Sequence, residues 1–433
     1  MKPVFFLVQW VRCLWPNNHA LEYVVTQLAA KAMAAMAQLY AIYVFSKILP
    51  PNEAALIFIL LGYGILVQIF ELGLSQVIQN ALNTKQITLS GVCQIISFHY
   101  ILMIFFAMLV RVFPGALHCL QGKQRVFDGG ADALAFPIGV ALLLISTNNV
   151  LVQRVLLVIN RGMVASKMVL LQGICSVLVL LFFQWHSATL VESITTYLVI
   201  PILIYAPLAL KLARKALRGI GRLEPINWPW LLRNALGFWG LTALSSIYLG
   251  ADYFFAAQHL TNEEMVAYHF SSRLFFISYV AYFSYVQYSA KGIAAETYYT
   301  DPQQVWGVAR RASVIGVIAV VVVLAAALAI KWSGGLDMIG AHGVVVAPLL
   351  LSAALYYGFR VFRDVCLVMT WNFGHQRLLY VVHVLEVVLC VLLMSVLAPK
   401  FGGKGIFFAM AFVAAVSTVL ICIAIRRMVP RLS

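Results

Sequence analysis

Charged residues are scarce in this sequence. Only 10% of the 433 residues are Asp, Glu, Lys or Arg, whereas 63% are hydrophobic, and the mean hydropathy is +0.93. A soluble domain has about 25% charged residues, so this composition excludes an ordinary soluble fold and indicates a polytopic membrane protein. Because one membrane-spanning helix takes about 20 residues, about twelve of them leave only short loops and no room for a soluble domain.

Several chemical signatures are also missing. The sequence contains no H-E-x-x-H, no G-x-S-x-G and no C-x-x-C motif, so we expect no catalytic residues, no metal site, no cofactor and no enzyme activity. The seven cysteines are scattered, which favours neither a disulfide framework nor a zinc site: Cys13, Cys93, Cys119, Cys175, Cys366, Cys390 and Cys422.

Acidic residues are half as common as basic ones, 15 against 30, and the net charge is +15. In a soluble protein this balance would suggest a nucleic-acid partner. Most of these Lys and Arg residues lie between apolar runs, where they set membrane orientation, so we expect no nucleic-acid partner. They concentrate in the loops that are cytoplasmic if both termini are cytoplasmic, which predicts that orientation.

Twelve uninterrupted apolar runs predict an all-α membrane protein. The expected spans lie near residues 22–47, 54–82, 87–113, 133–159, 164–184, 190–211, 231–257, 263–290, 305–331, 343–370, 375–398 and 404–425.

A basic linker with several Gly and Pro residues divides these spans into two groups of six. Trp10 and Trp15 near the N-terminus are typical of a segment at headgroup depth, and no small-residue cleavage site follows them. The predicted organisation is a cytoplasmic or interfacial segment, a six-helix bundle, a cytoplasmic linker, a second six-helix bundle and a cytoplasmic tail, at residues 1–20, 21–212, 213–230, 231–426 and 427–433.

A weak internal repeat relates the two groups, with a step of about 211 residues. Gln76 corresponds to Gln287, and Pro137 corresponds to Pro348. Two six-helix units in the same orientation are typical of parallel transporter repeats, in which the working cavity lies between the halves.

Lys31 and Arg273 are the lone charges of long apolar runs. A basic residue at the centre of a membrane helix costs about 2.5 to 3.5 kcal/mol, so it calls for an anionic partner or a water-filled cavity. We interpret both residues as candidate binding groups for an anionic substrate. The alternatives are structural pairing with a carboxylate, or snorkelling of Lys31 to the interface.

Further charges occur within the predicted spans. Arg154, Arg360 and Arg363 are candidates for guiding an anionic substrate, although they also fit positive-inside charges or an Arg363–Asp364 pair. Carboxylates within the membrane are the usual sites of proton or sodium coupling, and here they are alternatively structural partners of the basic residues. The four are Glu71, Asp252, Asp364 and Glu386, of which Asp252 is expected near the outer end of its span, within reach of water.

Histidines and aromatic residues also lie within the spans. His99, His269 and His383 are candidates for titration near neutral pH, with hydrogen-bonded packing as the commoner role. The eighth span is rich in Tyr and Phe over more than one face, which favours helix packing, with sugar binding by the tyrosines near Arg273 as the alternative.

Two helical hairpins and the C-terminal end carry a resemblance to a known family. Ile42 to Leu82 includes Lys47, an acidic loop and the sequence ELGLS, Asp252 to Ala290 forms the matching hairpin, and Lys400 to Gly405 reads KFGGKG. In these stretches the chain resembles Wzx-type polysaccharide flippases of the multidrug/oligosaccharidyl-lipid/polysaccharide (MOP) exporter superfamily. Pro50 and Pro51 stand where the family commonly has Gly-Pro.

The resemblance implies two pseudo-repeated six-helix bundles that form a V around a central cavity, lined mainly by the first, second, seventh and eighth spans. It also implies transport of an undecaprenyl-diphosphate-linked oligosaccharide, such as an O-antigen repeat unit, across the bacterial inner membrane. The implied partners are this glycan, the bilayer, optionally H+ or Na+, and the polysaccharide polymerase machinery.

Two other functions stay open. A membrane-embedded polysaccharide polymerase or ligase shares the lipid-linked context, but typically needs a long outer loop, and here the longest, about Pro114 to Asp132, is short. A drug or cation antiporter of the same superfamily would be expected to have an acidic cavity, whereas Lys31 and Arg273 are basic.

Overall fold

A computed structural model describes residues 18–112, 134–159, 161–186, 188–218, 226–291, 302–333, 346–372 and 376–428. Several predicted features lie outside these residues in whole or in part: the N-terminal segment up to residue 17, the outer loop at 114–132, the middle of the linker at 219–225 and the tail from 429 onward.

Within the described residues the secondary structure is helical. The elements are α2 (Asn18–Ile48), α3 (Pro51–Tyr63), η1 (Leu66–Glu71), α4 (Leu74–Asn83), α5 (Leu89–Val112), α7 (Ala135–Val158), α8 (Gly162–Trp185), α9 (Leu190–Arg218), α10 (Trp228–His259), α11 (Asn262–Lys291), α13 (Pro302–Trp332), α14 (Ala347–Asn372) and α15 (Gln376–Met428).

The helix pattern confirms the predicted fold class. With α3, η1 and α4 taken as one crossing and α15 as two, the described elements make twelve crossings. By length and apolar composition, 7 described helices qualify as membrane spans, and the longest of these windows covers both crossings of α15. The remaining α2, α10, α11 and α14 are also long enough to span, and they contain several of the candidate charges.

The second crossing is interrupted, which the sequence pattern did not predict. After α3 the chain continues as the 3-10 helix η1, passes through Leu72 and Gly73 with left-handed φ angles of 58° and 68°, and resumes as α4. Membrane-buried backbone away from a continuous helix needs substitute hydrogen-bond partners. At the break, side chains must therefore supply the hydrogen bonds that the helix does not.

The last two crossings form one long element with a kink. Gly402 within α15 has φ 57° and ψ −139°, a conformation that glycine adopts without a Cβ penalty. The break separates the two spans predicted at 375–398 and 404–425.

The packing of the helices repeats in the two halves of the chain. In the N-terminal lobe α2 packs on α8, α5 packs on α7 and α7 packs on α9; in the C-terminal lobe α10 packs on α15, α13 packs on α14 and α14 packs on α15. These are corresponding pairs if each lobe is one copy of a six-crossing unit. The two pseudo-repeated bundles expected from the sequence are thus present in the fold.

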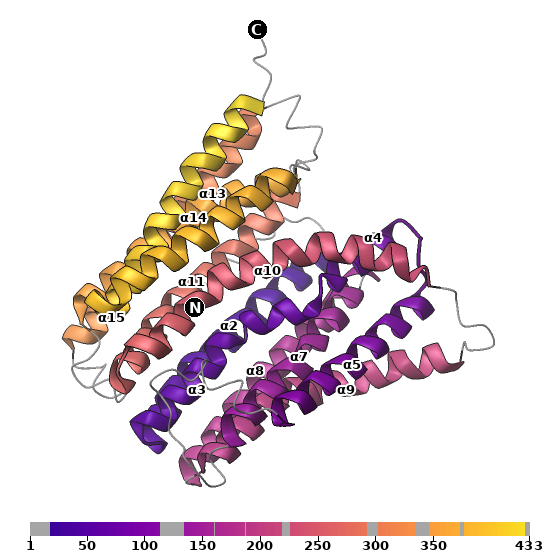
Figure 1. Ribbon diagram of the computed structural model, residues 1–433, viewed down its shortest axis with the longest axis horizontal. Coiled ribbons are helices and arrows are strands. Elements are labelled where there is room, and N and C mark those ends of the chain that lie inside the picture. Colours follow the sequence, from indigo (N-terminus) through magenta and orange to yellow (C-terminus); the bar gives the residue numbers. More distant parts are fainter. Residues whose placement is uncertain are drawn as a thin grey trace.

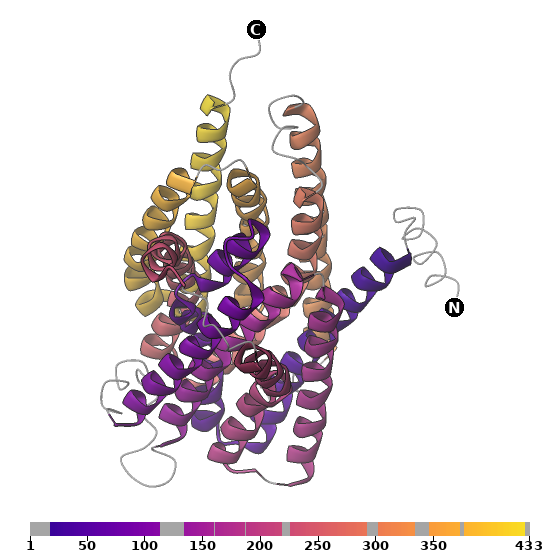
Figure 2. The same cartoon turned by 90° about the vertical axis from the view of Figure 1, so that its right-hand side faces the viewer.

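The lobes meet along the first two crossings of each unit. Helix α11 packs on α2 and α3, while α10 packs on α3, η1 and α4. In Figure 1 the turns from α2 to α3 and from α10 to α11 come together at the lower left, whereas α15 ends at the top and α5 and α9 extend to the right, so the lobes diverge as a V. Figure 2 shows α2, in indigo, slanting across the other helices.

Candidate functional site

Arg273 lies at the contact between the two lobes. Its Nη2 donates a hydrogen bond of 3.0 Å from α11 to the backbone carbonyl of Leu61 on α3, and its guanidinium lies 5.9 Å from the centre of the Tyr253 ring and 5.8 Å from that of Phe276. The residue is 8% exposed. Within the described residues no ion pair shorter than 4.0 Å involves Arg273. The carboxylate pairing considered from the sequence is therefore not formed here at Arg273.

Position along the repeat makes this contact unusual. Arg273 and Leu61 are 212 residues apart, close to the predicted repeat step of about 211. They consequently occupy nearly equivalent places in the two units, and a contact between equivalent places lies near the pseudo-two-fold axis. Arg273 thus places its charge where the lobes join.

Lys31 is half-buried on α2, the helix that packs between α8 and α11. It lies on the N-terminal lobe and Arg273 on the C-terminal lobe. The structure therefore places the two lone basic residues on neighbouring helices of opposite lobes.

Arg363 belongs to a buried ion-pair network. Its Nε and Nη2 donate to the two carboxylate oxygens of Glu386 at 2.6 and 2.5 Å, and its Nη1 donates to Asp364 Oδ1. Glu386 Oε2 is also 2.7 Å from His383 Nδ1. This fork geometry holds α14 to α15 and neutralises the charge of Arg363.

Arg360 extends the same network toward a group of tyrosines. Its Nε lies 3.3 Å from Asp364 Oδ2, and its guanidinium lies 4.1 Å from the centre of the Tyr279 ring. Tyr279 in turn donates its hydroxyl proton to Asp364. The rings of Tyr356 and Tyr357 also lie near the guanidinium. The pairing of Arg363 with Asp364, one of the two structural alternatives, is present, and two carboxylates balance the two arginines.

Asp252 is buried, and the expectation that water reaches it is wrong. The residue is 4% exposed, because Tyr268 from α11 covers it and donates a hydrogen bond of 2.7 Å to Oδ2. Its other oxygen, Oδ1, has no hydrogen-bond partner within the described residues. The backbone amide of Tyr253 and, more weakly, the charges of Arg273 and Arg360 also act on this carboxylate. A buried carboxylate oxygen without a donor is the kind of group that holds a proton or a cation.

Glu71 and Arg154 lie in the N-terminal lobe. Glu71 is buried at the break of the second crossing, where its Oε1 accepts a hydrogen bond of 3.1 Å from the amide of Ser75. It thereby caps the start of α4, which explains a structural need for the acidic residue in the sequence ELGLS. Arg154 is half-buried on α7 and makes no ion pair within the described residues.

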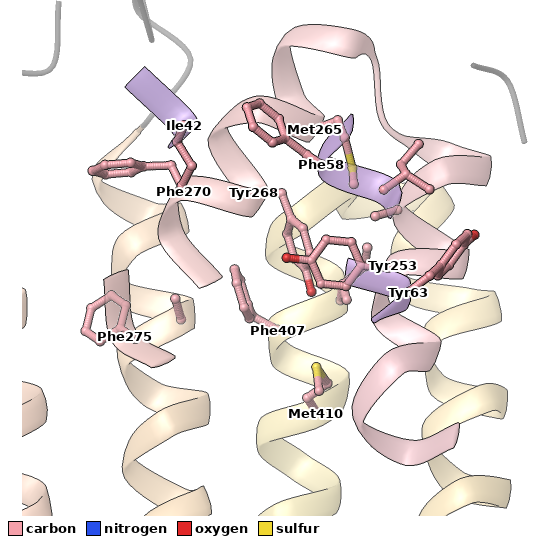
Figure 3. Close-up of a cluster of buried hydrophobic side chains, with 14 of the residues drawn as sticks. Ile42, Phe58, Tyr63, Tyr253, Met265, Tyr268, Phe270, Phe275, Phe407 and Met410 are labelled. Atoms are coloured by element: carbon pink, nitrogen blue, oxygen red, sulfur yellow. The ribbon is translucent and has the colours of Figure 1, made fainter. Parts of the chain in front are cut away.

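The aromatic residues of the eighth crossing take part in packing. Figure 3 shows Tyr253, Tyr268 and Phe407 with their rings close together, and Phe58 from the other lobe nearby. Tyr268 stacks on Phe407 with ring centres 4.7 Å apart, and Phe58 stacks on His269 at the same distance. Tyr253 also donates to or accepts from His269 Nδ1 at 2.7 Å. The packing role favoured from the sequence is the one observed.

A cavity of about 520 Å³ lies between the lobes at the turn from α4 to α5 and the start of α10. Its lining includes Lys85, Gln86, Asn227 and Trp230. None of these was a candidate from the sequence, because the cavity forms only when two distant segments meet. Lys85 is exposed and has a left-handed φ of 55°.

The structure adds polar contacts that sequence reasoning missed. Trp239 Nε1 on α10 donates a hydrogen bond of 2.9 Å to the carbonyl of Ile69 on η1, and His99 Nε2 lies 2.9 Å from the carbonyl of Phe70. The only available sequence signal was Gly73 inside a long apolar run, since an isolated glycine can mark a break. Within the described residues no group of three His, Cys, Asp or Glu side chains is arranged to hold a metal ion.

Comparisons with known proteins give the fold a context. No family model matches the sequence, and a search of curated proteins finds no match. Among solved structures, the lipid II flippase MurJ in an inward closed conformation has a TM-score of 0.70 and 11% identity, over 92% of this chain and 86% of that chain.

Two further structures are similar over nearly their full lengths. An inward-facing multidrug resistance MATE family transporter of the MOP superfamily has a TM-score of 0.66 and 14% identity, over 94% of this chain and 98% of that chain. A MOP superfamily transporter from Pyrococcus furiosus, described by a reversed polarity of its binding pocket, has a TM-score of 0.65 and 15% identity, over 98% and 97%. This chain therefore has the two-lobed helical fold of these membrane transporters.

Proposed function

We propose that this protein is a flippase for a diphosphate-linked lipid, with an undecaprenyl-diphosphate-linked oligosaccharide such as an O-antigen repeat unit as its substrate. The observation that carries the proposal is Arg273: a buried guanidinium near the pseudo-two-fold axis, bonded across the lobe contact to a carbonyl oxygen rather than to a carboxylate. A diphosphate oxygen is a stronger acceptor for this donor than a backbone carbonyl, because the bond becomes charge-assisted on both sides.

The proposed cycle separates the lobes and exposes Arg273. When the contact between α3 and α11 opens, the guanidinium exchanges the Leu61 carbonyl for the diphosphate, and Lys31 on the facing lobe adds a second cation. The polyprenyl tail stays in the lipid while the sugars pass between the lobes, so no covalent step is needed. The lobes then open toward the outside and the head group leaves. When the contact between α3 and α11 closes again, the Arg273–Leu61 bond is restored.

The membrane potential supplies a driving force in the proposed orientation, with both termini in the cytoplasm of a bacterial cell. A membrane potential that is negative inside favours the outward movement of two negative charges by about 2.3 kcal/mol per charge per 100 mV, or about 4 to 5 kcal/mol in total at 100 mV. Coupling to H+ or Na+ is then an addition rather than a requirement. Asp252 is the carboxylate best suited to it, because its Oδ1 lacks a donor in the described residues.

The buried arginines of α14 have a different proposed role. Arg360 and Arg363 are balanced by Asp364 and Glu386, so we assign them to holding the C-terminal lobe together rather than to primary diphosphate binding. Arg154 stays a candidate for guiding the substrate in the N-terminal lobe. Contact with the polymerase machinery is proposed only as the destination of the flipped lipid.

Reconstituted vesicles test the proposal. A fluorescent undecaprenyl-diphosphate disaccharide is placed in liposomes with the purified protein, and a membrane-impermeant quencher reports its movement between leaflets. We expect flipping by the wild type and at least a tenfold loss in Arg273→Ala and Lys31→Ala, since each 1.4 kcal/mol of lost binding is a factor of ten. Lys47→Ala is the matched control and should flip normally, because Lys47 is on the same helix as Lys31 but lies exposed in its last turn.

A drug antiporter is the second candidate, and the similarity to MATE transporters favours testing it. Proton-driven uptake of a cationic dye into the same vesicles measures this activity. Dye transport without lipid flipping would replace the flippase proposal. If the double variant Arg273→Ala with Lys31→Ala still flips the lipid and still transports the dye, the binding role of these residues is contradicted.

A further inference from the structure

The cavity between the α4–α5 turn and the start of α10 has a polar rim over an apolar floor. The rim consists of four exposed polar side chains: Lys85, Gln86, Thr88 and Asn227. The floor is half-buried or buried and packs with the apolar core that α4 and α10 share: Ile87, Ile226, Trp230 and Leu231. The volume of about 520 Å³ lies within the range of ligand-binding cavities.

Lys85 occupies a backbone position that favours glycine. It follows Thr84, the C-cap of α4, and has a φ of 55°. The amides of Lys85 and Gln86 donate hydrogen bonds of 3.2 and 2.8 Å to the carbonyls of Leu82 and Ala81. These two bonds define a Schellman motif, in which the left-handed residue is usually glycine because a Cβ is unfavourable there. The stability of the turn therefore does not explain why a lysine stands at this position.

The charge of Lys85 has no acidic counterpart nearby in the sequence. Residues 74–91 and 226–240 contain no Asp or Glu, and within the described residues Lys85 forms no ion pair shorter than 4.0 Å. Arg233, in the second turn of α10, and Lys211 and Arg214, toward the end of α9, are also exposed. Positive charge without a carboxylate favours an anionic ligand.

The cavity lies where crossings end, at a membrane surface. Its lining joins the end of the second crossing to the start of the seventh, and it includes Trp230, a residue type that is enriched at headgroup depth. A ligand that fits both parts of the lining needs an anionic group for the rim and an apolar part for the floor. A phospholipid has both, whereas a soluble phosphate matches the rim alone.

We propose that this cavity binds the headgroup phosphate of an anionic phospholipid of the bilayer. The phosphate contacts the Lys85 ammonium at the rim, and the upper part of the acyl chains covers the floor. Because residues 85–88 belong to the N-terminal lobe and residues 226–231 to the C-terminal lobe, the bound lipid connects the two lobes at this end. Arg273 is not part of the lining, so the site is independent of the transported substrate.

Photo-crosslinking locates the lipid on the protein. The full-length protein is placed in phosphatidylcholine vesicles with a small fraction of phosphatidylglycerol that carries a photoreactive headgroup, and peptide mass spectrometry maps the adducts. We expect adducts in residues 84–89 and 226–233, which excess unlabelled phosphatidylglycerol removes and excess inorganic phosphate does not. Removal by inorganic phosphate would show a site for soluble anions and overturn the proposal. Removal by undecaprenyl diphosphate but not by phosphatidylglycerol would show a substrate entry site and overturn it equally.

Two variants of Lys85 separate binding from folding. Lys85→Gly relieves the left-handed backbone, so the unfolding temperature without anionic lipid should be unchanged or higher, while the adducts should fall about fivefold. Lys85→Gln removes only the charge and should show the same loss. Lys167→Gln is the matched control, because Lys167 is exposed near the start of α8 at the same end of the crossings. Undiminished adducts in both Lys85 variants, or an equal loss in the control, would contradict the proposal.

Hydrogen–deuterium exchange tests the connection between the lobes. Phosphatidylglycerol should slow amide exchange in residues 84–91 and 226–236 together in the wild type, relative to phosphatidylcholine alone, because a ligand that binds the folded arrangement stabilises it. The effect should be lost in Lys85→Gly. Slower exchange in only one of the two segments would contradict a lipid that connects both lobes.

Discussion

Arg273 and Leu61 join the two lobes through one hydrogen bond, from a guanidinium on α11 to a backbone carbonyl on α3, between nearly equivalent places of the repeat. A side chain that needs its charge only for stability would be expected to have a carboxylate partner, as Arg363 does. Arg273 and Arg363 are both buried, at 8% and 3% exposure, but only Arg363 has a carboxylate partner in the described residues. Their replacement should therefore change the stability to different extents.

Arg273→Met should change the thermal stability less than Arg363→Met, because two effects oppose each other: it removes a buried charge that has no ion-pair partner in the described residues, and it leaves the Leu61 carbonyl without its donor. Arg363→Met should lower the stability by about 3 to 5 kcal/mol, because it leaves the buried Glu386 carboxylate without its arginine and with only His383 beside it. Thermal unfolding of both variants in the same detergent measures the difference. Equal destabilisation of the two variants would show that Arg273 is a structural residue.

The Arg363–Glu386 pair should behave as a coupled unit. Glu386→Gln keeps the shape but removes the charge, so we expect a loss of about 3 to 5 kcal/mol. The double variant Arg363→Met with Glu386→Leu should be closer to the wild type than either single variant, because neither charge is then left alone. A double-mutant cycle from unfolding midpoints gives the coupling, and strictly additive effects would argue against the network.

Gly73→Ala should disrupt the contact between the lobes. Its Cβ would lie 2.6 Å from both the Ala235 oxygen and the Trp239 nitrogen, and the left-handed backbone adds a penalty of about 1 to 2 kcal/mol for a residue with a side chain. We expect lower stability and loss of lipid flipping. Gly237→Ala on α10 is the control, because nothing lies within 4 Å of its Cβ position, and it should be neutral or slightly stabilising.

Asp252→Asn should separate ion coupling from stability. The amide oxygen still accepts from Tyr268, so folding should be preserved, whereas any dependence of flipping on a H+ or Na+ gradient should disappear. Tyr268→Phe should instead destabilise by about 1 to 3 kcal/mol, because it leaves Oδ2 without its donor. Flipping measured with and without each gradient, together with the unfolding midpoint, tests both. Unchanged ion dependence in Asp252→Asn would move the coupling to another group.

The predicted spans agree with the helices because hydropathy is a local property of the chain. The twelve crossings follow from apolar runs and their spacing. The break at Leu72 and Gly73 was missed because side chains from other helices, namely Trp239 and His99, bind the backbone carbonyls beside it. A hydropathy pattern contains no information about those donors.

The candidate site was predicted less completely than the fold. The sequence singled out the charges within the spans, and the structure places them in helices. It offered the Arg363–Asp364 pair as one alternative, but it did not reveal that Glu386 pairs with Arg363, or that Tyr268 covers Asp252. Partners of this kind depend on how each helix is rotated about its axis, which apolar runs leave undetermined.

What the sequence by itself determined is therefore the membrane class and the number of crossings, because a helix must satisfy its own backbone in lipid and needs about 20 apolar residues to do so. What only the tertiary structure decided is which charges are neutralised and which are not. Lys31 and Arg273 look alike in the sequence as lone charges. The bond from Arg273 to Leu61, 212 residues away, exists because two repeat units pack against each other.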